Sequence, residues 1–224
     1  MLPHNNIAAV LFDMDGTLID TDDTAVHDLA QRLRPLLGAE RAPLVARRLL
    51  MAAEWPGNSL LTLMDALHLD ETLFAFTDRL RRRRGLHPAG SFQLIPGVAP
   101  TVQQLHNHYQ LGIVTTRGRV QIDQFLAGFP ELANLFGVSC GRQDTRRLKP
   151  HPAPIQLAAR QLQIPVEQCL MVGDTTVDIK SARRAGAWAV GVLCGFGERA
   201  ELEKAGAHLV LDSTADLAQV LLGQ

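Results

Sequence analysis

The sequence has few cysteines and no surplus of charge of either sign. Its three cysteines, Cys140, Cys169 and Cys194, are an odd number and form no Cys-x-x-Cys pair, so they fit neither a disulfide framework nor a thiolate zinc site. Lysine and arginine together number 22, against 23 aspartates and glutamates. This balance gives no overall field that would attract nucleic acid or an anionic membrane. We therefore expect reduced thiols and no nucleic-acid partner.

Long apolar runs are also missing near the start of the chain. The first residues, MLPHNNIAAVLF, have no basic head, and their apolar run stops at Asp13. That run is too short for a signal peptide or a membrane span. We therefore expect a soluble, cytoplasmic protein with no membrane partner, and the sequence leaves open whether it is a monomer or a homodimer.

Short apolar runs closed by polar or glycine-rich turns predict buried parallel strands. The clearest are residues 7–12, 111–115, 169–173 and 187–193, and two weaker ones are FGVSCG and HLVL. Helical stretches lie between them, among them residues 152–163 and 176–186. Strands that alternate with helices predict an α/β fold with a doubly wound, Rossmann-like parallel sheet.

Residues 21–92 contain no convincing strand. Their apolar residues recur at helical spacing, and SLLTLMDALHL and ETLFAFTDRLRRRR have the pattern of amphipathic helices. The segment GLHPAGSFQLIPGV, rich in glycine and proline, is the expected return link. At 224 residues the chain is long for one compact unit and short for two. We predict a helical cap domain at residues 21–92, inserted into a core domain of residues 1–20 and 93–224.

Five aspartates follow the first predicted strand, within DMDGTLIDTDD. Residues two apart on an extended chain point to the same side, so Asp13 and Asp15 would present their carboxylates together unless the strand ends between them. A hard cation such as Mg²⁺ would relieve their repulsion. The alternative is that these aspartates cap the next helix, as we expect for Asp20, Asp22 and Asp23.

Three later polar segments also lie at or after predicted strands. Thr115 and Thr116 follow the second strand, Lys149 lies in a loop before a helix, and Asp174 follows a strand and a glycine, with Asp178 one helical turn further on. Taken singly, each has a plainer explanation as turn chemistry or an exposed lysine. Because ligands of open α/β sheets bind beyond the carboxyl ends of the strands, the segments together predict one site.

These segments carry a resemblance to a known superfamily. In order along the chain, DMDGTLID, IVTTR, LKPHP and GDTTVD resemble the four motifs of the haloacid dehalogenase superfamily, in its phosphoglycolate phosphatase-like branch with a helical cap. The resemblance spans nearly the whole chain. It implies a Mg²⁺-dependent phosphatase that hydrolyses the phosphate monoester of a small metabolite, phosphoglycolate-like or a sugar phosphate, through an aspartyl-phosphate intermediate.

The resemblance also implies roles for the acidic motif residues. Asp13 would attack the phosphorus, and Asp15 would act first as acid and then as base. Mg²⁺ would be held by the Asp13 carboxylate, the Asp15 backbone carbonyl and the Asp174 carboxylate. Asp178 resembles the outer-shell acid of the family, which would orient Lys149 or a metal-bound water.

Three further motif residues would bind the phosphoryl oxygens. These are Thr115, Thr116 and Lys149, of which Thr115 and Lys149 would take part in catalysis. Thr116 departs from the pattern, because many relatives carry asparagine there. Its backbone amide can still bind phosphate, so the departure puts close substrate analogy in doubt and leaves the reaction class intact.

Within the predicted cap, Gly57, Asn58 and Ser59 of EWPGNS resemble the turn that reads the substrate in the family, although a simple packing turn explains them as well. The highest local density of positive charge lies at Arg79 and Arg81–Arg84. Successive helical residues fan out around the axis, so we expect most of these arginines to be solvated. The alternative that one of them binds a substrate carboxylate stays open.

The motifs also bear on other functions of the same superfamily. A dehalogenase needs neither the acid at Asp15 nor a metal, and a phosphonate-cleaving relative needs a cap lysine, whereas the lysines here are Lys149, Lys180 and Lys204. Both are therefore disfavoured. A sugar-phosphate mutase shares the site and differs only in the phosphoryl acceptor, and a non-catalytic binding module could use the same fold. These two alternatives stay open.

Overall fold

The computed structural model describes residues 6–20, 31–35, 37–38, 42, 45 and 92–223. The chain divides into two compact units, one of Met1–Thr21 with Phe92–Gln224 and one of Asp22–Ser91. The few described residues of the second unit are helical. Gly57, Asn58, Ser59, Arg79 and Arg81–Arg84 lie outside the described residues, as do Asp22 and Asp23, so the helical cap stays a prediction.

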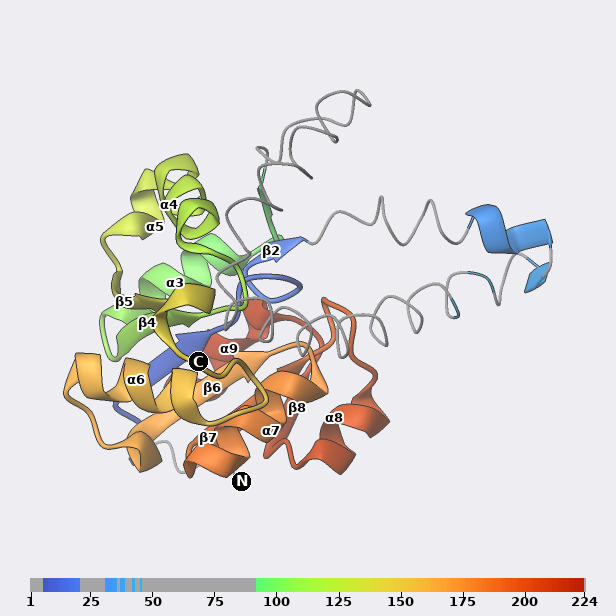
Figure 1. The fold of residues 1–224 in the computed structure, drawn as a ribbon. Coiled ribbons are helices and arrows are strands. Elements are labelled where there is room, and N and C mark those ends of the chain that lie inside the picture. The colour runs from blue at the N-terminus through green and yellow to red at the C-terminus, as the bar shows by residue number, and fades with distance from the viewer. Residues whose placement is uncertain are drawn as a thin grey trace. The chain divides into compact units, whose positions relative to one another are not determined.

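A six-stranded sheet forms the centre of the first unit (Figure 1). Its spatial order is β5-β4-β1-β6-β7-β8, and every pairing is parallel. The strands are β1 Ala9–Phe12, β4 Gln110–Val114, β5 Phe136–Cys140, β6 Cys169–Gly173, β7 Trp188–Val192 and β8 Leu209–Leu211. The predicted doubly wound parallel sheet is therefore confirmed, and all six strands lie close to their predicted limits.

Helices cover both faces of this sheet (Figure 1). One face packs against α3 Val98–His106, α4 Arg119–Gly128, α5 Pro130–Ala133 and α9 Leu217–Leu222, and the other against α6 Ala153–Leu162, α7 Thr176–Ala185 and α8 Arg199–Ala205. Short 3₁₀ turns are η2 Arg142–Asp144, η3 Val166–Gln168 and η4 Thr214–Asp216. Among the described helices, none combines the length and the hydrophobicity needed to cross a membrane.

The central strand β1 shows why the sequence reads as a continuous apolar run. Val10 and Phe12 pack into the core of one face, and Ala9 and Leu11 into the core of the other. All four side chains are fully buried. A strand covered on both faces has no side that faces solvent. Its sequence therefore lacks the alternation of apolar and polar residues that a half-exposed strand shows.

A short antiparallel pair lies where the chain leaves and re-enters the first unit. Strand β2, Ile19–Asp20, pairs with β3, Gln93–Leu94. These strands were not predicted, because two residues are too few to show a period. Asp20, which was expected to cap a helix, lies instead in β2 and pairs with Gln93.

Candidate active site

The candidate site is built from segments that follow adjacent strands. Asp13 comes directly after β1, Thr115 after β4 and Asp174 after β6. Since β1 lies between β4 and β6 in a parallel arrangement, their carboxyl ends meet at the same edge of the sheet. Lys149, from the loop before α6, reaches the same edge and contacts Asp13. The structure thus brings the four motif segments together, as the strand order requires.

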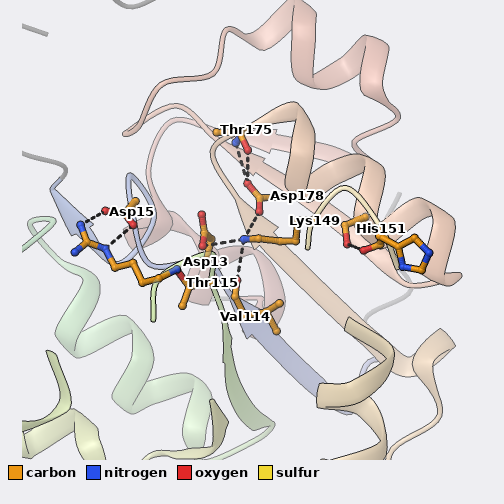
Figure 2. A network of polar contacts seen from close by, with 10 residues as sticks. Asp13, Asp15, Val114, Thr115, Lys149, His151, Thr175 and Asp178 are labelled. Atoms are coloured by element: carbon orange, nitrogen blue, oxygen red, sulfur yellow. Dashed lines mark hydrogen bonds and ion pairs between the residues drawn. The ribbon is translucent and has the colours of Figure 1, made fainter. Parts of the chain in front are cut away.

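Lys149 is the buried cation of this site. Its Nζ lies 2.8 Å from Oδ1 of Asp13 and 2.6 Å from Oδ1 of Asp178, and it donates a third hydrogen bond of 2.8 Å to the carbonyl oxygen of Val114. Figure 2 shows the ammonium group reaching between the two carboxylates. A lysine has three donors, and all three are used here.

The charge of Lys149 is stable in this position. Burial lowers the pKa of the lysine, but the charges of Asp13 and Asp178 and their hydrogen bonds outweigh that effect, so its pKa is raised above the ordinary value. The ammonium group therefore stays protonated throughout the neutral range, and it is held next to the carboxylate of Asp13.

Asp178 is fixed by the first turn of α7. Its Oδ2 accepts hydrogen bonds from the backbone N–H of Thr175 at 3.2 Å and from the Thr175 hydroxyl at 2.6 Å, while Oδ1 accepts from Lys149. This is the capping-box arrangement, in which a threonine and an acid three residues later satisfy the start of a helix. Asp178 therefore holds Lys149 in an ion pair, and its role as the outer-shell acid of the site stays a prediction.

Asp13, Asp174 and Asp178 form a buried cluster of carboxylates. One oxygen from each lies within 4.8 Å of the others. Asp174 accepts a 2.7 Å hydrogen bond at Oδ2 from the backbone N–H of Phe196, whereas its buried Oδ1 has no partner among the described residues. A buried carboxylate oxygen without a partner is costly, so the cluster has a place for a further positive group.

The proton affinities of the cluster lead to the same conclusion. Burial raises the pKa of Asp13 to about 7, an effect that Lys149 reduces and that the neighbouring acids Asp178 and Asp15 increase. Burial, followed by the charges of Asp178 and Asp13, raises the pKa of Asp174 well above its usual value. One ammonium does not balance three carboxylates. Hard oxygen donors with an uncompensated negative charge fit a divalent cation such as Mg²⁺.

Two glycines allow the backbone to close on Asp174. Gly16 has a φ of 66°, a conformation that favours glycine, and a Cβ there would lie 2.3 Å from Oδ2 of Asp174. A Cβ on Gly195 would lie 2.1 Å from the same oxygen. The segment Cys194–Gly197 was not singled out in the sequence, although two glycines directly after a strand would have been the signal.

Asp15 lies apart from Lys149 and Asp178, as Figure 2 shows. Its two oxygens accept hydrogen bonds from Arg117, Nε to Oδ2 at 2.7 Å and Nη2 to Oδ1 at 2.5 Å. Strand β1 ends at Phe12, so the alternation of an extended chain does not continue to Asp15. The two carboxylates of DMD therefore have different partners in this structure: Lys149 for Asp13 and Arg117 for Asp15.

Arg117 is itself held by its neighbours. Its guanidinium carbon lies 5.2 Å from the centre of the Phe92 ring, its backbone N–H donates to the hydroxyl of Thr115 at 3.1 Å, and its carbonyl oxygen accepts from the backbone N–H of Arg142 at 2.9 Å. Thr116, just before it, is half-buried. The sequence did not single out Arg117, although it stands within the segment IVTTR.

Comparison with known proteins identifies relatives along nearly the whole chain. The sequence model of a family described as haloacid dehalogenase-like hydrolase matches residues 10–192. A phosphoglycolate phosphatase of Salmonella paratyphi A is 31% identical over 240 residues, with 96% of this chain and 93% of the relative covered. The pyrophosphatase PpaX of Bacillus mycoides is 30% identical over 217 residues, with 96% and 97% covered. The crystal structure of a hydrolase from Pseudomonas syringae superimposes with a TM-score of 0.67 at 25% identity, covering 96% of this chain and 98% of that one.

Proposed function

This chain belongs to the haloacid dehalogenase-like hydrolase family, and we propose that it is a phosphatase that hydrolyses a small phosphate monoester through a phosphorylated Asp13. The observation that carries the proposal is the buried Lys149, which lies 2.8 Å from Asp13 beside an acidic cluster that includes the unpartnered oxygen of Asp174. A carboxylate, a fixed cation and a place for a metal are the groups that phosphoryl transfer to an aspartate requires.

In the first step of this proposal, a carboxylate oxygen of Asp13 attacks the phosphorus of the ester. The new bond joins that oxygen to phosphorus, and the bond from phosphorus to the ester oxygen breaks. Asp15 gives its proton to the departing oxygen, which leaves as an alcohol. Lys149 and Thr115 bind the phosphoryl oxygens while charge builds up on them, and Asp178 keeps Lys149 in place.

A divalent cation fits this site, since the carboxylate oxygens of Asp13 and Asp174 and the backbone carbonyl of Asp15 are the hard ligands that such an ion prefers. When bound, Mg²⁺ would reduce the repulsion between the negatively charged carboxylate and the negatively charged phosphate. Magnesium itself, as opposed to another divalent ion, is part of the proposal.

In the second step, water attacks the phosphorus of the acyl phosphate. Asp15, now a carboxylate, takes a proton from that water, and the bond between phosphorus and the Asp13 oxygen breaks. Inorganic phosphate leaves and Asp13 is restored. One residue therefore serves as acid and then as base, and Asp15 must reach the reacting oxygens in both steps.

We further propose that residues 21–92 form a helical cap domain, with Gly57, Asn58 and Ser59 among the groups that read the substrate. A cap would exclude water while Asp13 attacks the ester. The substrates in the names of the relatives, phosphoglycolate and pyrophosphate, are small and carry two anionic groups. A substrate of that kind is the one we propose for this chain.

Phosphate release from a panel of small phosphate esters in Mg²⁺ tests the proposal, together with an aryl phosphate as a general substrate. We expect Asp13→Asn to abolish turnover, because an amide does not attack phosphorus. Asp123→Asn, at an exposed position on α4, is the matched control and should keep full activity. Turnover that survives in Asp13→Asn would contradict the assignment of the nucleophile.

The same panel separates the alternatives. Interconversion of sugar phosphate isomers without release of phosphate would identify a mutase instead. If the intact chain released no phosphate and interconverted no isomer, a non-catalytic binding function would replace the phosphatase proposal.

A further inference from the structure

The ion pair between Asp15 and Arg117 has a consequence for substrate choice. We propose that Arg117 is a specificity residue that exchanges partners, holding Asp15 in the free chain and a second anionic group of the substrate in the complex, so that Asp15 is released for proton transfer. This inference rests on the proposed phosphatase function and extends it to the class of leaving group, which is an alcohol that carries a carboxylate or a phosphoryl group, or phosphate itself.

Asp15 is poorly placed to transfer a proton while a cation is bound to both of its oxygens. The guanidinium donates at 2.7 Å and 2.5 Å to Oδ2 and Oδ1, in the paired geometry that makes arginine–carboxylate contacts strong. To serve as an acid, Asp15 must carry a proton on one oxygen and direct it at the ester. A guanidinium that donates to that oxygen repels such a proton. Asp15 must therefore give up at least one of these hydrogen bonds during the reaction.

The backbone of Arg117 is held in place by its neighbours. Its backbone is bonded on both sides, to the Thr115 hydroxyl and to the Arg142 amide, and Gly141 approaches so closely that a Cβ there would lie 2.8 Å from the Arg117 carbonyl oxygen. The ring of Phe92 lies against the guanidinium. The guanidinium thus extends from an anchored backbone and lies against the Phe92 ring, so in this proposal the new partner comes to it.

The charge of Arg117 makes an unpaired state unfavourable. Arginine stays charged in proteins, and the two hydrogen bonds to Asp15 satisfy that charge here. Its side chain is 23% exposed, which leaves water only partial access. Removing one partner of a largely desolvated pair is costly, whereas replacing one anion by another of similar shape is not.

This difference yields selectivity between leaving groups. An ester whose leaving group carries a carboxylate or a phosphoryl group supplies Arg117 with a replacement partner, and the planar fork of arginine fits either anion in a bidentate manner. An ester with an uncharged leaving group supplies none. With such an ester, Asp15 is released only if Arg117 is left without an anion.

The experiment compares three compounds as substrates of the full-length chain in Mg²⁺: 2-phosphoglycolate, pyrophosphate and ethyl phosphate. The first two carry the second anion as a carboxylate and a phosphoryl group respectively, and the third carries none. We expect Arg117→Met to lower the ratio of kcat/KM for 2-phosphoglycolate to that for ethyl phosphate by about ten-fold or more. Arg117→Lys keeps the positive charge but loses the bidentate guanidinium, so its ratio should lie between those of Arg117→Met and the parent chain.

Arg119→Met is the matched control. Arg119 lies two residues further on in the same segment, but it bonds to Ser139 and Asp144 instead of Asp15. We expect Arg119→Met to have the same ratio of kcat/KM for 2-phosphoglycolate to that for ethyl phosphate as the parent chain. The ratio is a suitable readout because a merely structural loss would lower turnover of all three compounds by the same factor.

Three results would count against the inference. If Arg117→Met lowered kcat/KM for all three compounds by the same factor, Arg117 would have only a structural role. If Arg119→Met changed the ratio of kcat/KM values as much as Arg117→Met does, the effect would come from positive charge in general and not from Arg117. In both cases the proposed phosphatase function would stand. If the parent chain turned over none of the compounds and no other phosphate ester, the proposed function would fail, and this inference with it. A loss confined to 2-phosphoglycolate or to pyrophosphate would support the inference and identify which anion Arg117 receives.

Discussion

The ammonium group of Lys149 lies between the carboxylates of Asp13 and Asp178, 2.8 Å from one and 2.6 Å from the other. This single cation joins the proposed nucleophile to the helix α7, and both acids are buried with it. Its loss would leave two buried carboxylates without their cation.

We expect Lys149→Met to reduce phosphate release by roughly 100-fold or more, because the phosphoryl group loses its fixed cation. The free energy of unfolding should fall by about 3–5 kcal/mol, the usual cost of breaking a buried ion pair from one side. Phosphate assays and urea unfolding measure the two effects. Lys180→Met, at an exposed position of α7, is the control, and an equal loss in both variants would contradict the role of Lys149.

Gly195→Ala should weaken divalent metal binding by about ten-fold. The added methyl would lie 2.1 Å from Oδ2 of Asp174, so Asp174 must move away from the hydrogen bond that Phe196 donates. Calorimetric titration of the chain with MgCl₂ measures the affinity without reference to activity. Gly128→Ala, at the end of α4 where a Cβ meets nothing within 4 Å, should leave the affinity unchanged.

The stability of the metal-free chain should depend on pH through Asp13. Burial raises the pKa of Asp13 from 3.8 to about 7, so between these values the folded chain holds a proton that the unfolded chain has released. Stability contributed by this group therefore falls as pH rises through that window. Asp13→Asn removes the titration of this group, while that of Asp174, whose pKa burial also raises, remains.

Urea unfolding in EDTA at about pH 4.5 and about pH 7.5 spans most of this pH window. It measures how much the free energy of unfolding changes across the window. Relative to the parent chain, Asp13→Asn should be more stable at the higher pH than at the lower one. Asp123→Asn serves as the control for loss of an aspartate at the surface. The same relative stability of Asp13→Asn at both pH values would show that Asp13 does not titrate in this way.

The thiols should differ in their reaction with iodoacetamide. Burial raises the pKa of both Cys140 and Cys169 to about 11, and only the thiolate reacts. At about pH 8 roughly one in a thousand of these groups is ionised, and both are buried, whereas Cys194 is half-buried. Mass spectrometry should find Cys194 labelled first in the native chain and all three labelled in urea. Early labelling of Cys140 or Cys169 in the native chain would contradict this order.

The sequence predicted the parallel sheet because its buried strands carry a strong local signal. Residues such as Val10, Leu11 and Phe12 are apolar in an unbroken run, and the polar residues that follow each strand stand at the edge where ligands bind. The order of the strands then brings Asp13, Asp174 and Lys149 together. Their catalytic roles stay predictions, and so does everything placed on residues 21–92.

Other features could not be predicted, because they depend on contacts between distant parts of the chain. Asp15 and Arg117 are 102 residues apart, and Asp174 and Phe196 are 22 apart. Neither pair has a local pattern that distinguishes it from an ordinary turn. The strands β2 and β3 are likewise defined only by each other, since a two-residue strand has no period of its own.

The position of β1 in the sheet also bears on how the chain folds during synthesis. Its neighbours are β4 and β6, so that Ala9 pairs with Gln110 on one side and with Cys169 on the other. When Ala9–Phe12 leaves the ribosome, neither partner has yet been made, and β1 cannot be paired on both sides until β6 has emerged. A nascent chain must therefore leave at least one edge of this apolar segment unpaired until Cys169–Gly173 has been made, and an unpaired edge of this kind favours aggregation during folding.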